Sequence, residues 1–286
     1  MNRSIHRNMF RKILIPAIHG YELKDCLRVA NSMVSNESVL LAGMVVVGDE
    51  SSLSAGALPA QELRKSLREL KTKQDTNSLE LIRVTNHPWK ELTKIVREEK
   101  PDLLILDSAH CDAFRRSIPQ LLRDAPCNIA VACGVMPKKI QKVFVPMRGG
   151  PNAELALRLG LAFSRHGRAS IDTLHISPKT DKSTRDVAFR GLERVLNNLP
   201  EVHRKNLQTN DPTTSILLAY KAYDVMILGA TAFAEDKSTG LGEVAETILR
   251  DRSKGLLIVK VHHPASTNMQ SEFVGQTAIS VLVDRL

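Results

Sequence analysis

The chain carries the same series of short motifs twice, in the same order. The matching pairs are Lys12–Pro16 with Lys142–Pro146, Pro101–Leu106 with Tyr223–Leu228, and Leu122–Asp124 with Leu249–Asp251. The second member of each pair follows the first by 130, 122 and 127 positions, respectively. Three matches at nearly one offset predict a duplicated domain of roughly 125 residues, which is longer than the repeating unit of a solenoid. We therefore interpret the chain as two copies of one fold, called copy one and copy two.

Within each copy, apolar runs that suit buried strands alternate with segments of helical apolar period. In copy one we expect strands at 13–17, 39–47, 79–84, 103–106 and 128–133, with helices at 23–34, 54–70, 89–96 and 118–123. In copy two we expect strands at 143–147, 170–176, 203–208, 225–228 and 256–261, with helices at 152–165, 183–198, 213–222 and 242–251. This alternation indicates parallel sheets with right-handed crossovers.

The predicted fold class is α/β, with two tandem Rossmann-like domains. Each domain is expected to have a five-stranded parallel sheet of order 3-2-1-4-5, with helices on both faces. The two domains should pack as a pseudo-two-fold pair with separate sheets, so a single continuous sheet would contradict this expectation. We place the first domain at 1–137, the second at 138–262, and a polar tail at 263–286 that ends in the pattern of an extra strand.

Composition excludes several classes of protein. The chain is 43% hydrophobic and 25% charged, which is typical of globular domains. Its net charge is +9, but the basic residues are dispersed and aromatics are scarce, so specific nucleic-acid binding is not expected. The longest apolar run, 39–47, is far shorter than the ~20 residues of a membrane span. Four cysteines without a CxxC pair favour a reducing cytoplasm, and no signal peptide is predicted.

No motif in the chain indicates catalysis or a metal centre. The sequence has no Ser-His-Asp order, paired-carboxylate signature or HExxH motif, so an enzyme is not expected. His262 and His263 lack a third ligand nearby in sequence, and no metal is predicted. Asp102 and Asp224 each precede a buried strand, where aspartate commonly orients a turn.

Two loops of copy two stand where doubly wound folds hold ligands, outside the carboxyl ends of the strands at the switch point. The first, Met147–Pro151, follows the first strand and contains two glycines. The second follows the fourth strand, contains Gly229, Gly240 and Gly242, and leads into a helix whose N-terminus could face an anion. Copy one has Asp107 in place of the first of these glycines, so its site is expected to be degenerate.

These loops resemble those of the universal stress protein family, whose members carry a Val-Pro-Val-Asp-Gly-Ser loop after strand one. Members also have a nucleotide loop of the form G-x2-G-x9-G-[ST] after strand four. The resemblance covers residues 12–134 and 142–261 and implies the tandem form of the family. It further implies a cytoplasmic, non-catalytic stress-response or regulatory protein that binds ATP, AMP or another phosphate ligand in the second domain.

The match is complete in spacing and partial in identity. Ala232 replaces the second glycine of the nucleotide loop, Glu243 replaces the Ser/Thr, and Arg148 stands at the acidic position. Glu243 would repel a phosphate, whereas Arg148 could attract an anion. The residues expected to line the ligand site are Met147, Arg148, Gly149, Gly150, Ile176, Gly229, Ala230, Thr231, Gly240, Gly242 and Glu243. Plain turn and helix-entry roles for the glycines remain the alternative.

A second resemblance points to protein partners. Segments 50–64 and 87–92 look like stress-protein modules fused ahead of family-two glycosyltransferases that resemble glucosyl-phosphoglycerate synthases. Arg148–Pro151 looks like modules appended to membrane transporters. The alternative function is therefore a nucleotide-free interaction module that acts with such a partner or as a homodimer, either free-standing or as part of a longer protein.

Overall fold

The structure is a computed structural model that describes residues 9–74, 77–79, 81–177, 187–230, 241, 243–251 and 254–262. Three predicted site residues, Thr231, Gly240 and Gly242, lie outside the described residues, as does the predicted tail at 263–286. In the described part of the chain, no helix has the length and apolar character that crossing a membrane requires.

Copy one contains six strands and five α-helices in its described part. In chain order they are β1 (Ile13–Ile18), α1 (Lys24–Asn31), β2 (Val39–Val46), α2 (Ala57–Gln74), β3 (Asn77–Ser78), β4 (Arg83–Thr85), α3 (Pro88–Glu99), β5 (Leu103–Asp107), α4 (His110–Phe114), α5 (Ile118–Arg123) and β6 (Ile129–Cys133). Short 3-10 turns precede β2 and α2, at Asn36–Ser38 and Glu50–Gly56.

Copy two repeats this order with one strand and one α-helix fewer in its described part. Its elements are β7 (Lys142–Met147), α6 (Pro151–Arg165), β8 (Ser170–Ser177), α7 (Val187–Asn197), β9 (Val202–Gln208), α8 (Pro212–Tyr220), β10 (Val225–Gly229), α9 (Glu243–Asp251) and β11 (Gly255–Lys260). The strand predicted at 203–208 is present as β9, at an edge of the sheet.

The strands follow the predicted order within each copy. Copy one runs β3-β2-β1-β5-β6, with β4 also paired to β2, and copy two runs β9-β8-β7-β10-β11. All neighbours within a copy are parallel, including β1 with β5 and β7 with β10. Each copy is therefore a Rossmann-like unit of order 3-2-1-4-5, in which strand three of copy one is divided between β3 and β4.

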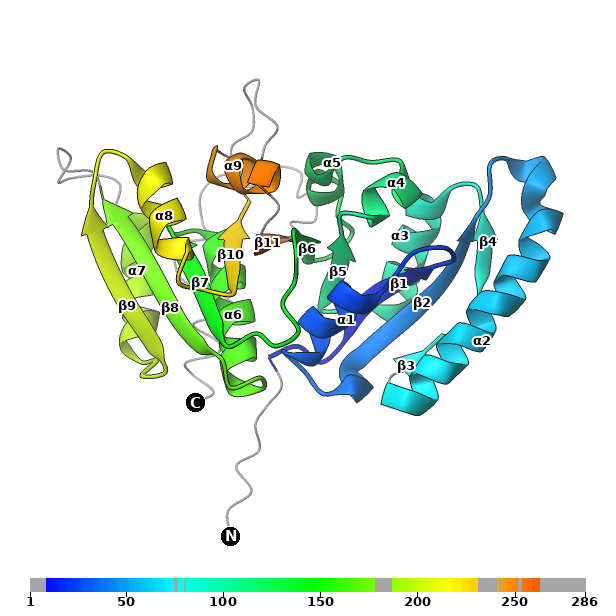
Figure 1. Cartoon of the computed structure of the whole chain (residues 1–286), viewed down its shortest axis with the longest axis horizontal. Coiled ribbons are helices and arrows are strands. Elements are labelled where there is room, and N and C mark those ends of the chain that lie inside the picture. Colours follow the sequence, from blue (N-terminus) through cyan, green and yellow to red (C-terminus); the bar gives the residue numbers. More distant parts are fainter. Residues whose placement is uncertain are drawn as a thin grey trace, which may run out of the picture.

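The expectation of two separate sheets is wrong. β6 and β11 pair antiparallel over five residue pairs, from Leu256 with Cys133 to Lys260 with Ile129, and join the two copies into one eleven-stranded sheet. Each of these strands is the last of its copy and is apolar, and an unpaired edge of this kind exposes a row of N–H and C=O groups. Antiparallel pairing of the two edges satisfies those groups. We call this ladder the seam; it lies at the centre of the molecule in Figure 1.

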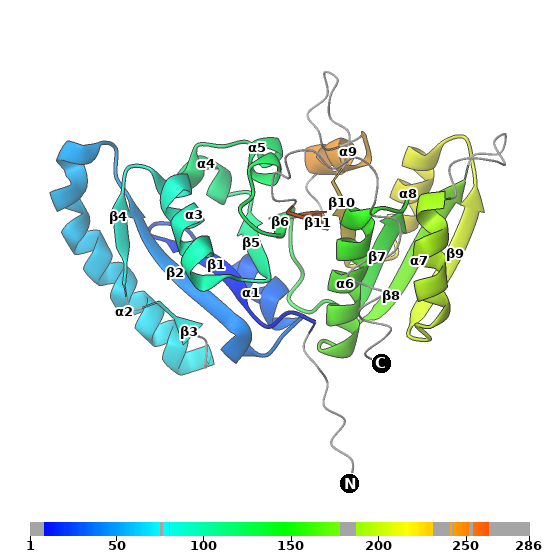
Figure 2. The same cartoon turned by 180° about the vertical axis from the view of Figure 1, so that it is seen from behind.

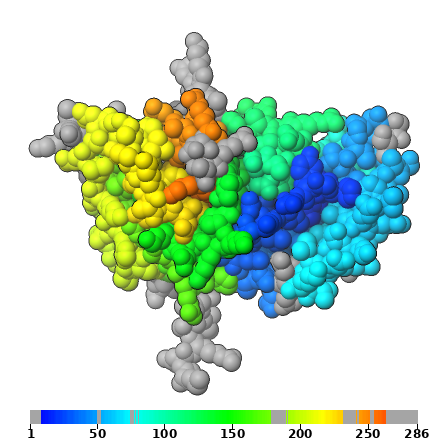
Figure 3. Space-filling view, viewed as in Figure 1, coloured from blue at the N-terminus to red at the C-terminus, as the bar shows by residue number. Residues whose placement is uncertain are grey.

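The hydrophobic core forms two layers, one on each face of the continuous sheet. Residues of α1, α2, α6 and α7 pack on one face, and residues of α3, α4, α5, α8 and α9 pack on the other. In Figure 1, α1 and α2 lie in front of the strands of copy one, and α8 lies in front of those of copy two; in Figure 2, α3, α6 and α7 lie in front. Figure 3 shows the surfaces of the two copies lying side by side. Alternate seam residues enter opposite layers: Ala130 and Leu257 belong to the first layer, Val131 and Ile258 to the second. Both core layers therefore run across the seam.

A matched pair of arginines also links the copies across the pseudo-two-fold axis. Arg28 of α1 donates from Nη1 to the carbonyl of Met136, which lies before the first strand of copy two (3.1 Å). Arg158 of α6, 130 positions later, donates from Nε to the carbonyl of Met9, which lies before the first strand of copy one (3.1 Å). Arg158 also stacks over Phe10, with 4.4 Å from its guanidinium carbon to the ring centroid.

The repeated aspartates have a structural role, but each binds a distant strand entry and not the local turn that was expected. The Asp102 carboxylate accepts hydrogen bonds from the backbone N–H groups of Arg11 (2.6 Å) and Lys12 (3.0 Å). Asp224 accepts the matching pair, from Gln141 (2.8 Å) and Lys142 (2.9 Å). Each aspartate thus ties the start of strand four to the entry of strand one in its own copy.

Some predicted boundaries differ from the structure. The strand expected at 79–84 is split into β3 and β4, and Leu81 between them is 59% exposed. An interruption of this strand costs little free energy, because the strand lies at an edge of the sheet and pairs with β2 alone. The helix expected at 23–34 is shorter, and the short helix α4 was not predicted.

Because both core layers cross the seam, we predict that the copies unfold together. Ile258 is fully buried in the seam, so Ile258→Ala should lower the free energy of unfolding by about 2–4 kcal/mol and Ile258→Val by about 1 kcal/mol. The sole tryptophan, Trp89, lies in copy one and reports on that copy. In urea unfolding, Trp89 fluorescence and far-ultraviolet circular dichroism should shift together. An unchanged fluorescence midpoint with a shifted dichroism curve would show that the copies unfold independently.

Candidate functional site

The first predicted loop of copy two is a tight turn that leads from β7 into α6. Gly149 and Gly150 have φ angles of +95° and +87°, in the region that favours glycine. A Cβ atom added to Gly150 would meet nothing within 4 Å, so backbone conformation alone requires glycine there. Pro151 then occupies the first turn of α6, where its fixed φ suits the helix.

We call the region at the carboxyl ends of β7, β10 and β11 the crevice of copy two. Asn152, in the first turn of α6, closes this crevice. Its Nδ2 donates to the carbonyl of Ala230 after β10 (2.7 Å), and its Oδ1 accepts from the backbone N–H of Val261 after β11 (2.9 Å). The side chain is buried, with 9% of Asn152 exposed. One amide therefore uses its donor and its acceptor to tie α6 to the ends of both strands. Sequence analysis did not single out this residue.

The close approach of α6 also accounts for Gly229. A Cβ atom at this position would lie 2.9 Å from the backbone carbon of Asn152 and 3.0 Å from its carbonyl oxygen, which is closer than real contacts allow. Gly229 is therefore required by the packing of helix α6 against strand β10, whether or not a ligand binds.

The other described site residues spread around this crevice. Met147 is buried, and its carbonyl faces Nδ1 of His175 at 3.3 Å. Ile176, next to that histidine, packs at the border of the second core layer. Arg148 is exposed. Glu243, in the first turn of α9, accepts a hydrogen bond at Oε2 from the hydroxyl of Thr213 on α8 (2.9 Å), so its carboxylate faces a neighbouring helix.

Glu243 places a carboxyl group in the first turn of α9, at the helix N-terminus that would otherwise attract a phosphate. Glu154 lies in the first turn of α6, where burial raises the pKa of its carboxyl group to about 7. A large fraction of the Glu154 carboxyl group is therefore neutral at pH 7, which weakens its repulsion of an anion.

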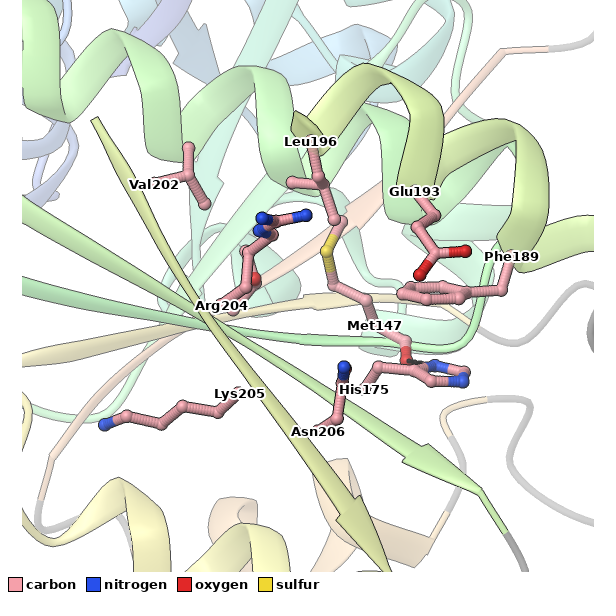
Figure 4. Close-up of a pocket in the computed structure, with 10 residues that line it drawn as sticks. Met147, His175, Phe189, Glu193, Leu196, Val202, Arg204, Lys205 and Asn206 are labelled. Carbon is pink, nitrogen blue, oxygen red and sulfur yellow. Dashed lines mark hydrogen bonds between the residues drawn. The ribbon is translucent and has the colours of Figure 1, made fainter. Parts of the chain in front are cut away.

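A separate hollow of about 420 Å³ lies between α7 and the sheet. Figure 4 shows Glu193 and Phe189 on the helix facing Met147, His175 and Arg204 on the strands. The His175 and Phe189 rings stack with centroids 3.5 Å apart. The hollow begins at the end of β7, beside the predicted site, and its lining is mainly polar.

Copy one closes its crevice with a different group of side chains. His110 is fully buried; its Nδ1 lies 2.7 Å from Oδ1 of Asp107, and its Nε2 lies 3.0 Å from the carbonyl of Pro16. The thiol of Cys26, on α1, lies 3.6 Å from the other carboxylate oxygen of Asp107. These three side chains occupy the space near the carboxyl ends of β1 and β5.

The charges within this cluster shift the pKa values of its members. Burial raises the pKa of the Cys26 thiol well above its ordinary value, and the Asp107 carboxylate adds to the effect. Burial also acts to raise the pKa of Asp107, but hydrogen bonding and the charge of His110 outweigh it and lower that pKa overall. Sequence analysis noted that Asp107 replaces the glycine of copy two, but it missed the partners of Asp107. His110, three residues later at the start of a helix, was a local signal of this contact.

We predict that Asn152 is needed to close copy two. Asn152→Asp keeps the acceptor for Val261 but sets an oxygen against the carbonyl of Ala230, so it should lower the free energy of unfolding by about 2–3 kcal/mol. Asn198→Asp is the matched control, because the amide of this exposed asparagine bonds the carbonyl of Arg194 at the surface. It should cost less than about 0.5 kcal/mol. Equal effects of the two changes in urea unfolding would contradict the role given to Asn152.

Comparisons with known proteins agree on the fold. No protein-family model and no curated protein sequence matches the chain. Among solved structures, a universal stress protein from Archaeoglobus fulgidus aligns with a TM-score of 0.60 at 12% identity, over 86% of this chain and 97% of that one. A putative universal stress protein from Pseudomonas aeruginosa aligns with a TM-score of 0.54 at 16% identity, over 87% and 92%.

A third similar structure belongs to a membrane transport protein. It is the cytoplasmic domain of a prokaryotic cation chloride cotransporter, with a TM-score of 0.51 at 12% identity over 87% of this chain and 94% of that domain. Each of these three structures matches both copies, because each alignment covers well over half of the chain. The chain therefore has the universal stress protein fold in its tandem, two-domain form.

Proposed function

We propose that the chain is a non-catalytic regulatory module of the universal stress type, and that it acts in the cytoplasm by contacting a partner protein. The observation that supports this proposal is the closing of both ligand crevices by the chain's own side chains. Asn152 bridges the strand ends of copy two, and Asp107 with His110 fills the matching place in copy one. A phosphate approaching the backbone of Gly229 would meet the start of α6 instead.

The absence of catalysis in this proposal follows from burial. Cys26, Asp107 and His110 form a described cluster of residue types that enzymes use, but the thiol is buried and its pKa is raised. The reactive form of a cysteine is the thiolate, which these surroundings disfavour. The cluster therefore lacks an activated nucleophile that a substrate could reach.

Helix α8 offers a surface for a partner. Its segment Ile216–Tyr220 is apolar, yet Tyr220 is the one residue of the helix that is buried. Leu218 is 58% exposed, and Ile216 and Leu217 are partly exposed. Ile216 and Leu217 pack partly against the second core layer, so Leu218 is the exposed apolar side chain of α8 that we assign to a protein contact. Leu207, 40% exposed on the neighbouring strand β9, adds to the apolar surface of copy two.

A membrane transporter is the class of partner that we favour. The similarity to a cytoplasmic domain of a cation chloride cotransporter supports it, as does the resemblance of the Arg148–Pro151 loop to transporter-linked modules. A glycosyltransferase or a second copy of this chain is the alternative partner.

Nucleotide binding in copy two is the second candidate function. The turn through Gly149 and Gly150 favours it, because there is open space beside Gly150 and Arg148 is exposed next to it. On that hypothesis, ATP or AMP lies over residues 229–231 and 240–242. The helix at the end of this loop, α9, would then direct its N-terminus at the phosphates.

Calorimetric titration with ATP, AMP and cyclic AMP separates the two functions. We expect no heat of binding at millimolar nucleotide and no turnover of ATP, because both crevices are closed. Saturable binding would favour the nucleotide hypothesis over ours. In that case Glu243→Ser should strengthen binding by on the order of 1 kcal/mol, since it removes a repulsive charge.

Two further variants locate the ligand if binding is found. Thr213→Val removes the hydrogen bond to Glu243 without changing its charge, and is therefore the matched control for Glu243→Ser. Gly242→Val should abolish binding by blocking the approach of phosphate to the backbone. If Gly242→Val binds as the wild type does, the ligand lies elsewhere.

Photo-cross-linking in cells tests the contact surface. A photoreactive phenylalanine analogue at position 218 should give a discrete cross-linked product that mass spectrometry identifies as a transport protein. The control is the same analogue at position 58, because Leu58 of α2 is as exposed (65%) but lies in copy one. A product made equally from both positions, or from neither, would count against α8 as the contact surface, and a product with a second copy would indicate a homodimer.

A further inference from the structure

We propose that copy one binds a transition-metal dication of the zinc type through Cys26, Asp107 and His110. These residues come from three separate elements: α1, the end of β5 and the start of α4. One ligand atom from each lies within 4.8 Å of the other two, and all three side chains are buried. Among the residues that the structure describes, this is the one group of its kind.

The donor atoms suit such an ion. A thiolate, an imidazole nitrogen and a carboxylate oxygen are the three ligand types that zinc accepts in proteins. Sγ of Cys26 lies 3.6 Å from Oδ2 of Asp107, and Nδ1 of His110 lies 2.7 Å from Oδ1 of the same carboxylate. The three groups therefore face one another closely enough to share one ion after small movements. Three protein ligands are one fewer than the four of a structural zinc site.

A second layer of contacts already orients the ligands. Nε2 of His110 faces the carbonyl of Pro16 at 3.0 Å, which leaves Nδ1 directed at Asp107. Metal-binding histidines commonly donate their other ring N–H to a backbone carbonyl in this way. Oδ1 of Asp107 accepts the backbone N–H of Ala109 at 2.9 Å, so this oxygen is held and Oδ2 is turned toward Cys26.

The donor set is specific to copy one. At the offsets that relate the copies, Cys26 corresponds to Ala156, Asp107 to Gly229 and His110 to Ala232. Copy two thus lacks all three donor atoms and closes its crevice with Asn152 instead. Asp107 and His110 pair with each other, but copy two fills its crevice with a single amide, so filling alone does not require a thiol, a carboxylate and an imidazole together.

Binding exchanges the S–H bond of Cys26 for a sulfur–metal bond, and the thiol proton passes to the solvent. A buried site of this kind is best loaded as the chain folds. The test is therefore to unfold the full-length chain in a chelator, remove the chelator, and refold it with Co²⁺ as a coloured substitute for Zn²⁺. We expect one equivalent of Co²⁺ per chain and a near-ultraviolet thiolate-to-cobalt charge-transfer band, which Zn²⁺ should displace.

Cys26→Ser should remove this band and weaken Co²⁺ binding by more than about 100-fold, since even outer-shell changes cost 10–100-fold. The matched control is Cys127→Ser, which removes a thiol that is partly buried and lies outside the cluster. Its band should equal that of the wild type. Circular dichroism checks that each variant has refolded.

Native mass spectrometry of the refolded wild type gives a readout that needs no variant. If the wild type carries no metal after refolding with Co²⁺ and with Zn²⁺, the proposal is overturned. The role of the cluster would then be to fill the crevice with hydrogen-bonded side chains. A charge-transfer band that persists in Cys26→Ser would overturn it as well. Neither result bears on nucleotide binding, which concerns the other copy.

Discussion

The antiparallel pairing of β6 with β11 organises the whole molecule. Each copy is a parallel unit whose last strand would otherwise be an open, apolar edge. Five residue pairs join these edges, and alternate side chains of the seam enter the core layers on both faces of the sheet. The pseudo-two-fold axis and the crossing contacts of Arg28 and Arg158 both follow from this one ladder.

The local sequence pattern was sufficient to predict the architecture of each copy. It was not sufficient to predict that the two copies pair into one sheet. Strand order within a copy followed from the alternation of elements, and the repeated aspartates were explained by the N–H groups that they bind at the entry of strand one. Whether two apolar last strands pair with each other or each remain an edge depends on contacts more than 120 residues apart, such as Cys133 with Leu256. No spacing or turn signal encodes that choice.

The candidate sites show a similar limit. Gly149 and Gly150 were correctly placed in a turn, but Gly229 has a glycine-specific role that no motif could assign. A glycine that admits a phosphate and a glycine that admits a neighbouring helix look the same in sequence, and here the structure shows the helix. Asn152 was not distinguished because a single asparagine in a helix start is common. Cys26 and His110 are separated by more than 80 residues, and the fold alone brings them together.

The seam has a consequence for how this fold depends on concentration. Two separate chains that paired their edge strands would come apart on dilution, whereas here a short connection between Cys133 and Lys142 holds one edge beside the other. Pairing is then intramolecular and is governed by an effective concentration set by that connection, on the order of millimolar for short linkers. Covalent duplication also frees the two halves from having to remain identical. One crevice can therefore gain ionisable side chains while the other gains an amide, within a sheet that stays intact at any protein concentration.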